Sequence, residues 1–369
     1  MAVGLALVVV GGSLFNILPL MTAGAADKLG FSGREAGLLS SVLTVASGVG
    51  CLLSGGWVRS LRWPRAAAVS LGGMFAANLA TLFVHDYLAF VMMQAVAAFF
   101  ASAVFSLGMT ILSDGHESAR TFGIAIATQS AYQIAVLWAG PSLLRLSGLD
   151  GVLVLLAIPA GVFIALAPLL PDQGRPSAAE QSARGLLKPA TLLAFAGFVI
   201  FFMGAGAYWT YLELMGQALG LTTRAVAGWA AAGVAAGIPA GIIASAQGRS
   251  FGSLWPLGCA GLLMLIAAIL LSGVYGLMAF GIAGMLYYFG WCYSLTYQFA
   301  LVNAVDPTGR AVAVTGACAF FGSAAGAALT ALFVAPNDYH AVIYVVAVAA
   351  CTSPTLYALS YAVHRRTIT

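Results

Sequence analysis

Long apolar runs, interrupted at regular intervals by glycine, proline or charged residues, dominate the pattern of this chain. Each run is long enough for a membrane-spanning helix, which needs about 20 apolar residues. We therefore predict about twelve transmembrane helices in two sets. The first set lies at 3–25, 36–56, 66–84, 87–112, 121–144 and 150–170, and the second at 191–217, 224–246, 254–273, 276–302, 310–334 and 341–362.

The segment 171–190 is the longest stretch without a predicted span, and it divides the chain nearly in half. It contains proline, serine and charged residues, which are typical of a loop. We interpret it as a cytoplasmic linker between an N-terminal six-helix bundle, residues 1–170, and a C-terminal six-helix bundle, residues 191–369. The first span has no basic leader and carries Asn16 and Pro19 inside it, so we interpret it as a membrane helix and not as a cleaved signal peptide.

The composition excludes a soluble protein, because 62% of the 369 residues are hydrophobic and only 7% are charged, against about 25% charged residues in soluble domains. The lysines, Lys28 and Lys188, do not follow a glycine-rich run, so the chain has no Walker A phosphate loop. It has no C-x-x-C or H-E-x-x-H motif, so we expect no metal site and no cofactor. No nucleophile–base pattern indicates an enzyme, and the net charge of +4 lies in loops, so we expect no nucleic-acid partner.

Most of the 15 lysine and arginine residues fall in the predicted loops on the side of both chain termini. Cytoplasmic loops carry an excess of these residues. We therefore expect a multi-pass protein of the plasma (inner) membrane with both termini in the cytoplasm, and we expect it to be a monomer in the lipid bilayer.

The second half of the chain echoes the first at an offset of about 190 residues. The matches recur in order: Arg34 with Arg224, Trp63-Pro64 with Trp255-Pro256, Asp114 with Asp306, and Arg120 with Arg310. A repeat of six spans at a fixed offset indicates two bundles related by a pseudo-two-fold axis along the membrane normal. We therefore predict an all-α membrane protein of that architecture.

The loop after the second predicted span, GGWVRSLRWPR at 55–65, is similar to the motif G-x-x-x-D-R-x-G-R of the major facilitator superfamily, with Arg59 at the acidic position. The second-half copy, GIIASAQGR at 241–249, has Ser245 there. With the repeat, these motifs make the chain resemble that superfamily over nearly its whole length. The resemblance implies secondary transport by alternating access. It also implies gating by loop charges, here Asp114, Arg120, Asp306 and Arg310, although the same charges would equally serve to set the topology.

Glu213 is the one acidic residue inside a predicted span. Burial in the membrane favours the protonated form of a carboxyl group, so Glu213 is the candidate proton carrier if transport is coupled to protons. Its position, roughly 33 Å along the helix from 191, equally fits an exposed glutamate at the outer membrane surface. Tyr208 and Trp209, just before it, are candidate substrate-binding residues, but they would equally fit an interfacial aromatic belt.

The tenth predicted span carries Tyr287, Trp291, Tyr293 and Gln298 in or near its middle, where an aromatic belt does not explain them. These residues fit either the lining of a substrate cavity or packing between helices. The other candidate polar residues are Gln129, Tyr132 and Gln133 in the fifth span, Asn16 in the first and Gln94 in the fourth. Asn16 precedes Pro19, whose ring interrupts the helical hydrogen bonds and indicates a kink.

No lysine or arginine lies in the middle of a span, which argues against transport of a small inorganic anion. We expect a secondary transporter that exports a small amphipathic organic solute, coupled to protons through Glu213. The pair Gly140-Pro141, similar to part of the family's antiporter motif, favours export. The alternatives are proton-coupled uptake of a small nutrient, such as an aromatic acid or a sugar, and a membrane sensor that has lost transport.

Overall fold

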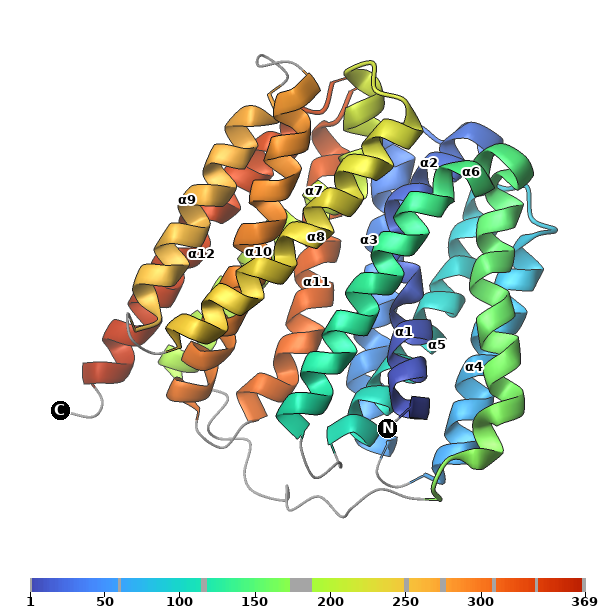
Figure 1. The fold of residues 1–369 in the computed structure, drawn as a ribbon, viewed down its shortest axis with the longest axis horizontal. Helices are drawn as coiled ribbons and strands as arrows, with labels where there is room; N and C mark the ends of the chain where they lie inside the picture. Colours follow the sequence, from blue (N-terminus) through green and yellow to red (C-terminus); the bar gives the residue numbers. More distant parts are fainter. Residues whose placement is uncertain are drawn as a thin grey trace. The chain divides into compact units, whose positions relative to one another are not determined.

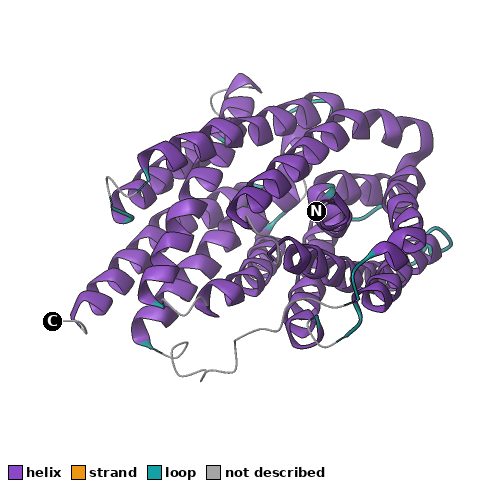
Figure 2. Ribbon diagram, turned by 60° about the horizontal axis from the view of Figure 1, so that its bottom comes forward, coloured by secondary structure: helices purple, strands orange, loops and turns teal. Residues whose placement is uncertain are grey.

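The computed structural model describes residues 2–58, 61–113, 118–172, 188–248, 252–272, 277–306, 310–335 and 338–366. The chain divides into two compact units, unit 1 from Met1 to Glu180 and unit 2 from Gln181 to Thr369. The division falls inside the segment 171–190 that the sequence assigns to the linker. Apart from one isolated bridge between Ala335 and Asp338, the regular secondary structure of the described residues is helical (Figure 2).

The described residues of unit 1 form six α-helices and one short 3-10 helix, η1, and the bounds of these helices follow the apolar runs of the sequence (Figure 1). They are α1 (Ala2–Asn16), α2 (Leu18–Leu29), α3 (Gly33–Trp57), α4 (Trp63–Thr81), α5 (Tyr87–Ser113), α6 (Ser118–Leu166) and η1 (Ala167–Leu169).

Two of these elements differ from simple spans. The first predicted span is broken into α1 and α2, which meet at Ile17 with a bend of 45°. Pro19 lies in the first turn of α2, where its missing N–H costs no helical hydrogen bond. The kink predicted from Asn16 and Pro19 is therefore present. Conversely, α6 contains two predicted spans, which meet in a kink at Gly148. Gly148 has φ 59° and ψ −155°, a conformation that glycine adopts without strain.

In unit 2, the residues that the structure describes form six helices, which begin and end within a few residues of the predicted spans. They are α7 (Pro189–Ala218), α8 (Thr223–Gln247), α9 (Leu254–Leu270), α10 (Leu277–Val305), α11 (Arg310–Phe333) and α12 (His340–Arg366). Across the described residues, seven helices are long and apolar enough to cross a membrane, and the bent pair of α1 and α2 adds an eighth candidate span.

The helices pack by the same scheme in both units. In unit 1, α5 packs against α1, α3 and α4, and α4 also packs against α6. In unit 2, the corresponding α10 packs against α7, α8 and α9, and α9 also packs against α12. The recurrence in packing matches the repeat that the sequence shows at an offset of about 190 residues.

Glycines allow α11 to approach the backbone of α7 within unit 2. A Cβ atom added at Gly322 would lie 2.5 Å from the carbonyl oxygen of Val199, and one added at Gly326 would overlap the carbonyl oxygen of Met203. Small residues at this spacing permit close contact between membrane helices. The glycine stripe of α11 is therefore a packing surface. By contrast, a Cβ at Gly241 of α8 meets nothing within 4 Å.

We predict opposite effects for the same substitution at these two glycines. Gly326→Ala should lower the free energy of unfolding by about 1–3 kcal/mol, because a methyl group there forces the helices apart. Gly241→Ala should leave it unchanged or raise it, since alanine favours a helix over glycine by about 0.5–1 kcal/mol. Thermal unfolding of both variants in detergent measures the difference, and equal midpoints would contradict it.

Candidate functional site

Aromatic side chains from α7 and α10 form a continuous cluster in unit 2. The rings of Tyr208 and Tyr287 lie with their centroids 4.2 Å apart and their planes 32° apart. The ring of Trp209 is 6.0 Å from that of Tyr288, which is in turn 5.3 Å from the ring of Trp291. We call these five residues the α7–α10 aromatic cluster.

The cluster is buried, which separates it from an interfacial belt. Tyr208 is 2% exposed, Trp209 1%, Tyr287 0% and Trp291 7%, whereas belt residues place their rings at the lipid headgroups. The hydroxyl of Tyr287 has no hydrogen-bond partner among the described residues. A buried tyrosine hydroxyl ordinarily has a partner, so this group is a candidate for binding a polar ligand.

The C-terminal half of α10 forms side-chain hydrogen bonds with α8 and α12. The hydroxyl of Tyr293 donates to Oε1 of Gln247 on α8 at 2.6 Å. On another side, the hydroxyl of Tyr357 on α12 donates to Oε1 of Gln298 at 2.8 Å, and Nε2 of Gln298 donates to Ser294 at 3.0 Å. The hollow beside Ser294 and Gln298 has a volume of about 10 Å³, room for about one water molecule. In this structure these residues join helices.

Glu213 is buried, with 2% of its surface exposed. Nε2 of Gln217, one turn later on α7, donates to Oε1 of Glu213 at 3.1 Å and to Oγ1 of Thr223 on α8 at 3.2 Å. Of the two environments that the sequence allowed for Glu213, the exposed one is therefore wrong. An ionised carboxylate in such a place is costly unless it is paired and hydrogen-bonded.

In unit 1, the amides and the tyrosine predicted from the fifth span lie along α1. A Cβ at Gly12 would overlap Nε2 of Gln129, so α6 contacts the backbone of α1 at this point. Tyr132 is half-buried and lies close to Ser13 of α1. Gln133 is 5% exposed, and Asn16, at the end of α1, is 3% exposed. Nδ2 of Asn16 has no hydrogen-bond partner among the described residues, so a donor lies at the break between α1 and α2.

Gln94 belongs to a different environment. It is 0% exposed, and its Nε2 donates to Oγ1 of Thr81 at 3.0 Å and to Oδ1 of Asn78 at 3.4 Å. Both partners come from α4, so these hydrogen bonds join α4 to α5. The amide serves helix packing here, although its Oε1 has no partner among the described residues.

The predicted gating residues are only partly within the described residues. Asp306 is 4% exposed, and its Oδ2 accepts a hydrogen bond from the backbone N–H of Ala311 at 2.9 Å, at the start of α11. A carboxylate at this position stabilises the helix N-terminus. Arg120 lies in α6 and Arg310 begins α11, but their side chains lie outside the described residues, as does Asp114.

Three buried or hydrogen-bonding residues near these sites were not among the candidates predicted from the sequence. Tyr211 of α7 is 0% exposed, and its hydroxyl has no partner among the described residues. Gln217 binds Glu213, and Asn78 binds Gln94. The position of Gln217 four residues after Glu213 would have indicated their contact, because residues at that spacing share a helix face.

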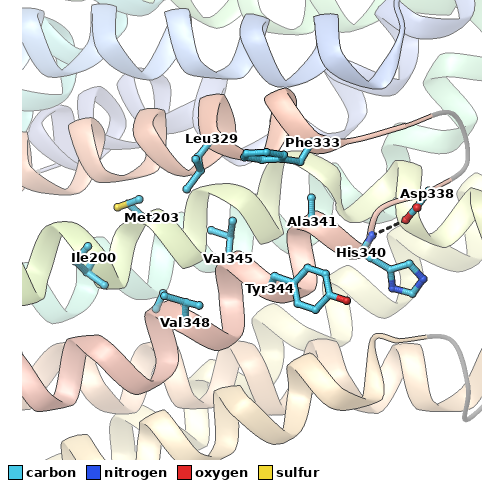
Figure 3. A pocket seen from close by; sticks show the side chains of 11 residues that line it. Ile200, Met203, Leu329, Phe333, Asp338, His340, Ala341, Tyr344, Val345 and Val348 are labelled. Atoms are coloured by element: carbon cyan, nitrogen blue, oxygen red, sulfur yellow. Dashed lines mark hydrogen bonds between the residues drawn. The ribbon is translucent and has the colours of Figure 1, made fainter.

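The described residues hold no group of three or more His, Cys, Asp or Glu side chains that would bind a metal ion. A mostly apolar groove of about 450 Å³ lies in unit 2 between α7, α11 and α12 (Figure 3). Ile200 and Val348 lie along it, and Asp338 and His340 lie at one end. None of the residues predicted to bind substrate lines this groove.

Comparison with known proteins identifies the class of the molecule. The sequence profile of the Major Facilitator Superfamily matches residues 3–326. The chain therefore belongs to the major facilitator superfamily and is a multi-pass membrane transporter. The predicted fold class, an all-α membrane protein with about twelve spans, is confirmed. No curated protein matches the chain in sequence.

Solved structures of transporters share the fold. The nucleoside transporter NupG superposes with a TM-score of 0.74 and 17% identity, covering 98% of this chain and 99% of that chain. A mutant of the same transporter gives 0.78 and 12%, covering 98% of each chain. A bacterial homologue of the human lysosomal transporter Spinster, inward-facing and occupied, gives 0.69 and 12%, covering 98% and 95%.

Two tyrosine-to-phenylalanine variants should separate ligand binding from packing. Tyr357→Phe should lower the free energy of unfolding by about 1–3 kcal/mol, because it leaves Oε1 of Gln298 buried without its donor. Tyr287→Phe removes a hydroxyl that has no partner in the described residues, so the unfolding midpoint should not fall. Thermal unfolding of both variants in detergent is the measurement, and a loss of stability in Tyr287→Phe alone would contradict the assignment.

Proposed function

We propose that this protein is a secondary active transporter that moves a small amphipathic organic solute by alternating access, coupled to protons through Glu213, in the direction of export. The observation that carries the proposal is the burial of Glu213, at 2% exposure, on the same helix as Tyr208 and Trp209. The proton site and the aromatic cluster thus share α7.

The spacing along α7 supports a direct link between protonation and binding. Trp209 and Glu213 are four residues apart and share a helix face. A charged Glu213 is costly in its buried position, so the carboxyl group binds a proton when α7 is closed off from water. Exposure of α7 to water on one side of the membrane releases that proton. A solute that binds against Trp209 changes the exposure of α7 to water. Solute binding is thereby coupled to proton release from Glu213.

The chemistry of the candidate residues supports a neutral or cationic solute with an apolar or aromatic part. The rings of Tyr208, Tyr287 and Trp291 offer stacking surfaces and cation–π contacts. The hydroxyl of Tyr287 in unit 2 and Nδ2 of Asn16 in unit 1 have no partner among the described residues, so each can form a hydrogen bond with a solute. We assign substrate binding to these residues and to Gln129, Tyr132 and Gln133, and gating to Asp306 at the start of α11 with Arg310, Asp114 and Arg120.

Uptake of a small nutrient, such as an aromatic acid or a sugar, is the second candidate, since the same aromatic and amide side chains also suit an uncharged ring. Flux into inverted membrane vesicles distinguishes the two directions. Accumulation inside inverted vesicles, driven by a proton gradient, supports export, whereas accumulation in right-side-out vesicles or cells supports uptake.

Glu213→Gln should abolish proton-driven transport, because glutamine keeps the size and hydrogen-bonding capacity of the side chain but cannot release a proton. The measurement is accumulation of a fluorescent cationic dye in an efflux-deficient bacterial host, with and without a protonophore. Wild-type protein should lower the accumulation, and both the protonophore and Glu213→Gln should restore it.

Glu35→Gln is the matched control for this experiment. Glu35 forms a capping box with Ser32 at the start of α3, with its Oε2 accepting from the Ser32 N–H at 2.8 Å, and glutamine is equally suited to that position. It should therefore transport as the wild type does. An active, protonophore-sensitive Glu213→Gln protein would remove Glu213 as the carrier. No change in dye with any variant would instead remove broad cation export.

Trp291→Ala should weaken substrate binding without removing proton coupling. Loss of one aromatic contact costs about 0.5–1.5 kcal/mol beyond area burial, which corresponds to a fall in affinity of about twofold to tenfold. Concentration-dependent transport of the identified solute, or its stabilisation of the purified protein against heat, provides the affinity. An unchanged affinity would place the solute away from the aromatic cluster.

A further inference from the structure

A second hollow, in unit 1, combines apolar walls with exposed arginines. It lies between the end of α3, the start of α4 and the middle of α5, and its volume is about 400 Å³. Arg62 and Arg65 lie at the start of α4, and Val69 and Phe99 belong to its apolar walls. We call it the α4–α5 groove. None of the residues assigned to substrate or proton binding lines it.

The two arginines of the groove have different partners. Arg62 donates from Nε at 3.1 Å and from Nη2 at 2.6 Å to Oδ1 of Asp172, and the backbone N–H of Trp63 donates to the carbonyl oxygen of Asp172 at 3.0 Å. These bonds hold the start of α4 to the end of the sixth span. Arg65 is exposed, and within the described residues it has no ion-pair or hydrogen-bond partner. One guanidinium of the groove is thus uncompensated.

The apolar part of the groove continues from Arg65 along the helix axis. Val69, four residues later and on the same helix face, is 66% exposed. The rings of Phe99 and Phe100, 5.4 Å apart between centroids, form the wall on α5. Gly73 permits this arrangement, since a Cβ there would overlap the ring of Phe100. The groove therefore has a cationic end and an apolar length, both within a membrane-embedded unit.

We propose that the α4–α5 groove binds an anionic phospholipid, with the phosphate on Arg65 and one acyl chain against Val69 and Phe99. A guanidinium group binds phosphate oxygens through two parallel hydrogen bonds. Basic pockets between membrane helices on the cytoplasmic side bind anionic lipid headgroups, and the arginine distribution predicts that this end of unit 1 is cytoplasmic. The volume lies within the range of about 300–1,000 Å³ that is usual for ligand sites.

Charge distinguishes this groove from the larger one of unit 2. The unit 2 groove has Asp338 and His340 at its end, and Oδ1 of Asp338 accepts the backbone N–H of His340 at 3.0 Å (Figure 3). Its polar end thus carries a carboxylate, which repels a phosphate. In the α4–α5 groove, the carboxylate of Asp172 pairs with Arg62, and Arg65 has no acidic partner within the described part of the chain. Of the two apolar grooves, the one in unit 1 therefore fits an anionic lipid.

Lipid titration of the purified full-length protein tests the proposal. Native mass spectrometry in a neutral detergent would count phosphatidylglycerol and phosphatidylcholine molecules bound at each concentration. Wild-type protein should bind phosphatidylglycerol more tightly, and Arg65→Gln should weaken that binding about fivefold, the ratio that corresponds to about 1 kcal/mol per basic residue near a membrane. Arg34→Gln is the matched control. Arg34 is likewise exposed and lies in the first turn of α3 in unit 1, but it does not line the α4–α5 groove. It should bind as the wild type does.

A second pair of variants tests the acyl part of the site. Val69→Trp fills the groove and keeps both arginines, so it should also weaken phosphatidylglycerol binding. Leu88→Trp, at a 65% exposed position of α5 outside the groove, should not. Glycerol phosphate, which has the headgroup charge without acyl chains, should fail to compete, whereas competition by it would indicate a soluble phosphate ligand and overturn the lipid assignment.

Equal binding of both lipids, or unchanged phosphatidylglycerol binding in Arg65→Gln or in Val69→Trp, would also overturn the proposal. Each variant is first checked by gel filtration and thermal unfolding, and Arg65→Lys provides a charge-retaining substitution if Arg65→Gln does not fold. With a single donor group in place of a planar fork, Arg65→Lys should bind phosphatidylglycerol with an affinity between those of the wild type and the glutamine variant.

Discussion

The absence of hydrogen-bonding solvent in the bilayer is the constraint on which this structure depends. Backbone N–H and C=O groups must be satisfied within each spanning segment, so apolar segments of this length form helices. The same constraint acts on side chains, because a polar group placed in a span needs a partner from another helix or a functional reason to be there. With 7% charged residues in the chain, each buried polar group can be considered individually.

Considered in this way, the buried polar atoms separate into two kinds, and Gln94 carries one of each, a bonded Nε2 and an Oε1 without a partner among the described residues. Gln94 and Gln298 bind side chains of neighbouring helices, and their hydrogen bonds hold α4 to α5 and α10 to α12. The amide of Asn16 and the hydroxyl of Tyr287 have no partner among the described residues. Groups of the second kind cost stability unless a ligand or water satisfies them, and this cost is the physical basis for assigning them to substrate binding.

Alternating access requires units that are rigid within themselves, and small residues provide that rigidity here. Gly322 and Gly326 allow α11 to lie on the backbone of α7, so the helix that carries Tyr208 and Glu213 is held closely in unit 2. In the proposed mechanism, a proton gained or lost at Glu213 would therefore act on a packed helix and not on an isolated side chain. The arginines at the start of α4 are, by contrast, at the surface of unit 1. Arg62 pairs with Asp172, whereas Arg65 has no partner among the described residues.

The helices could be predicted from the sequence, because hydropathy and the glycine, proline and charged residues that interrupt the apolar runs are local properties. The sequence located the spans to within a few residues, the break near Asn16 and Pro19, and the boundary between two spans that the structure places at Gly148. It also indicated the family through loop motifs and a repeat. Which buried polar side chains have hydrogen-bond partners depends on contacts between residues that are distant in the sequence. Tyr357 reaches Gln298 across 59 residues of sequence, and no spacing rule relates them. Likewise, position along α7 could not show that Glu213 is buried, since burial depends on which neighbouring side chains cover it.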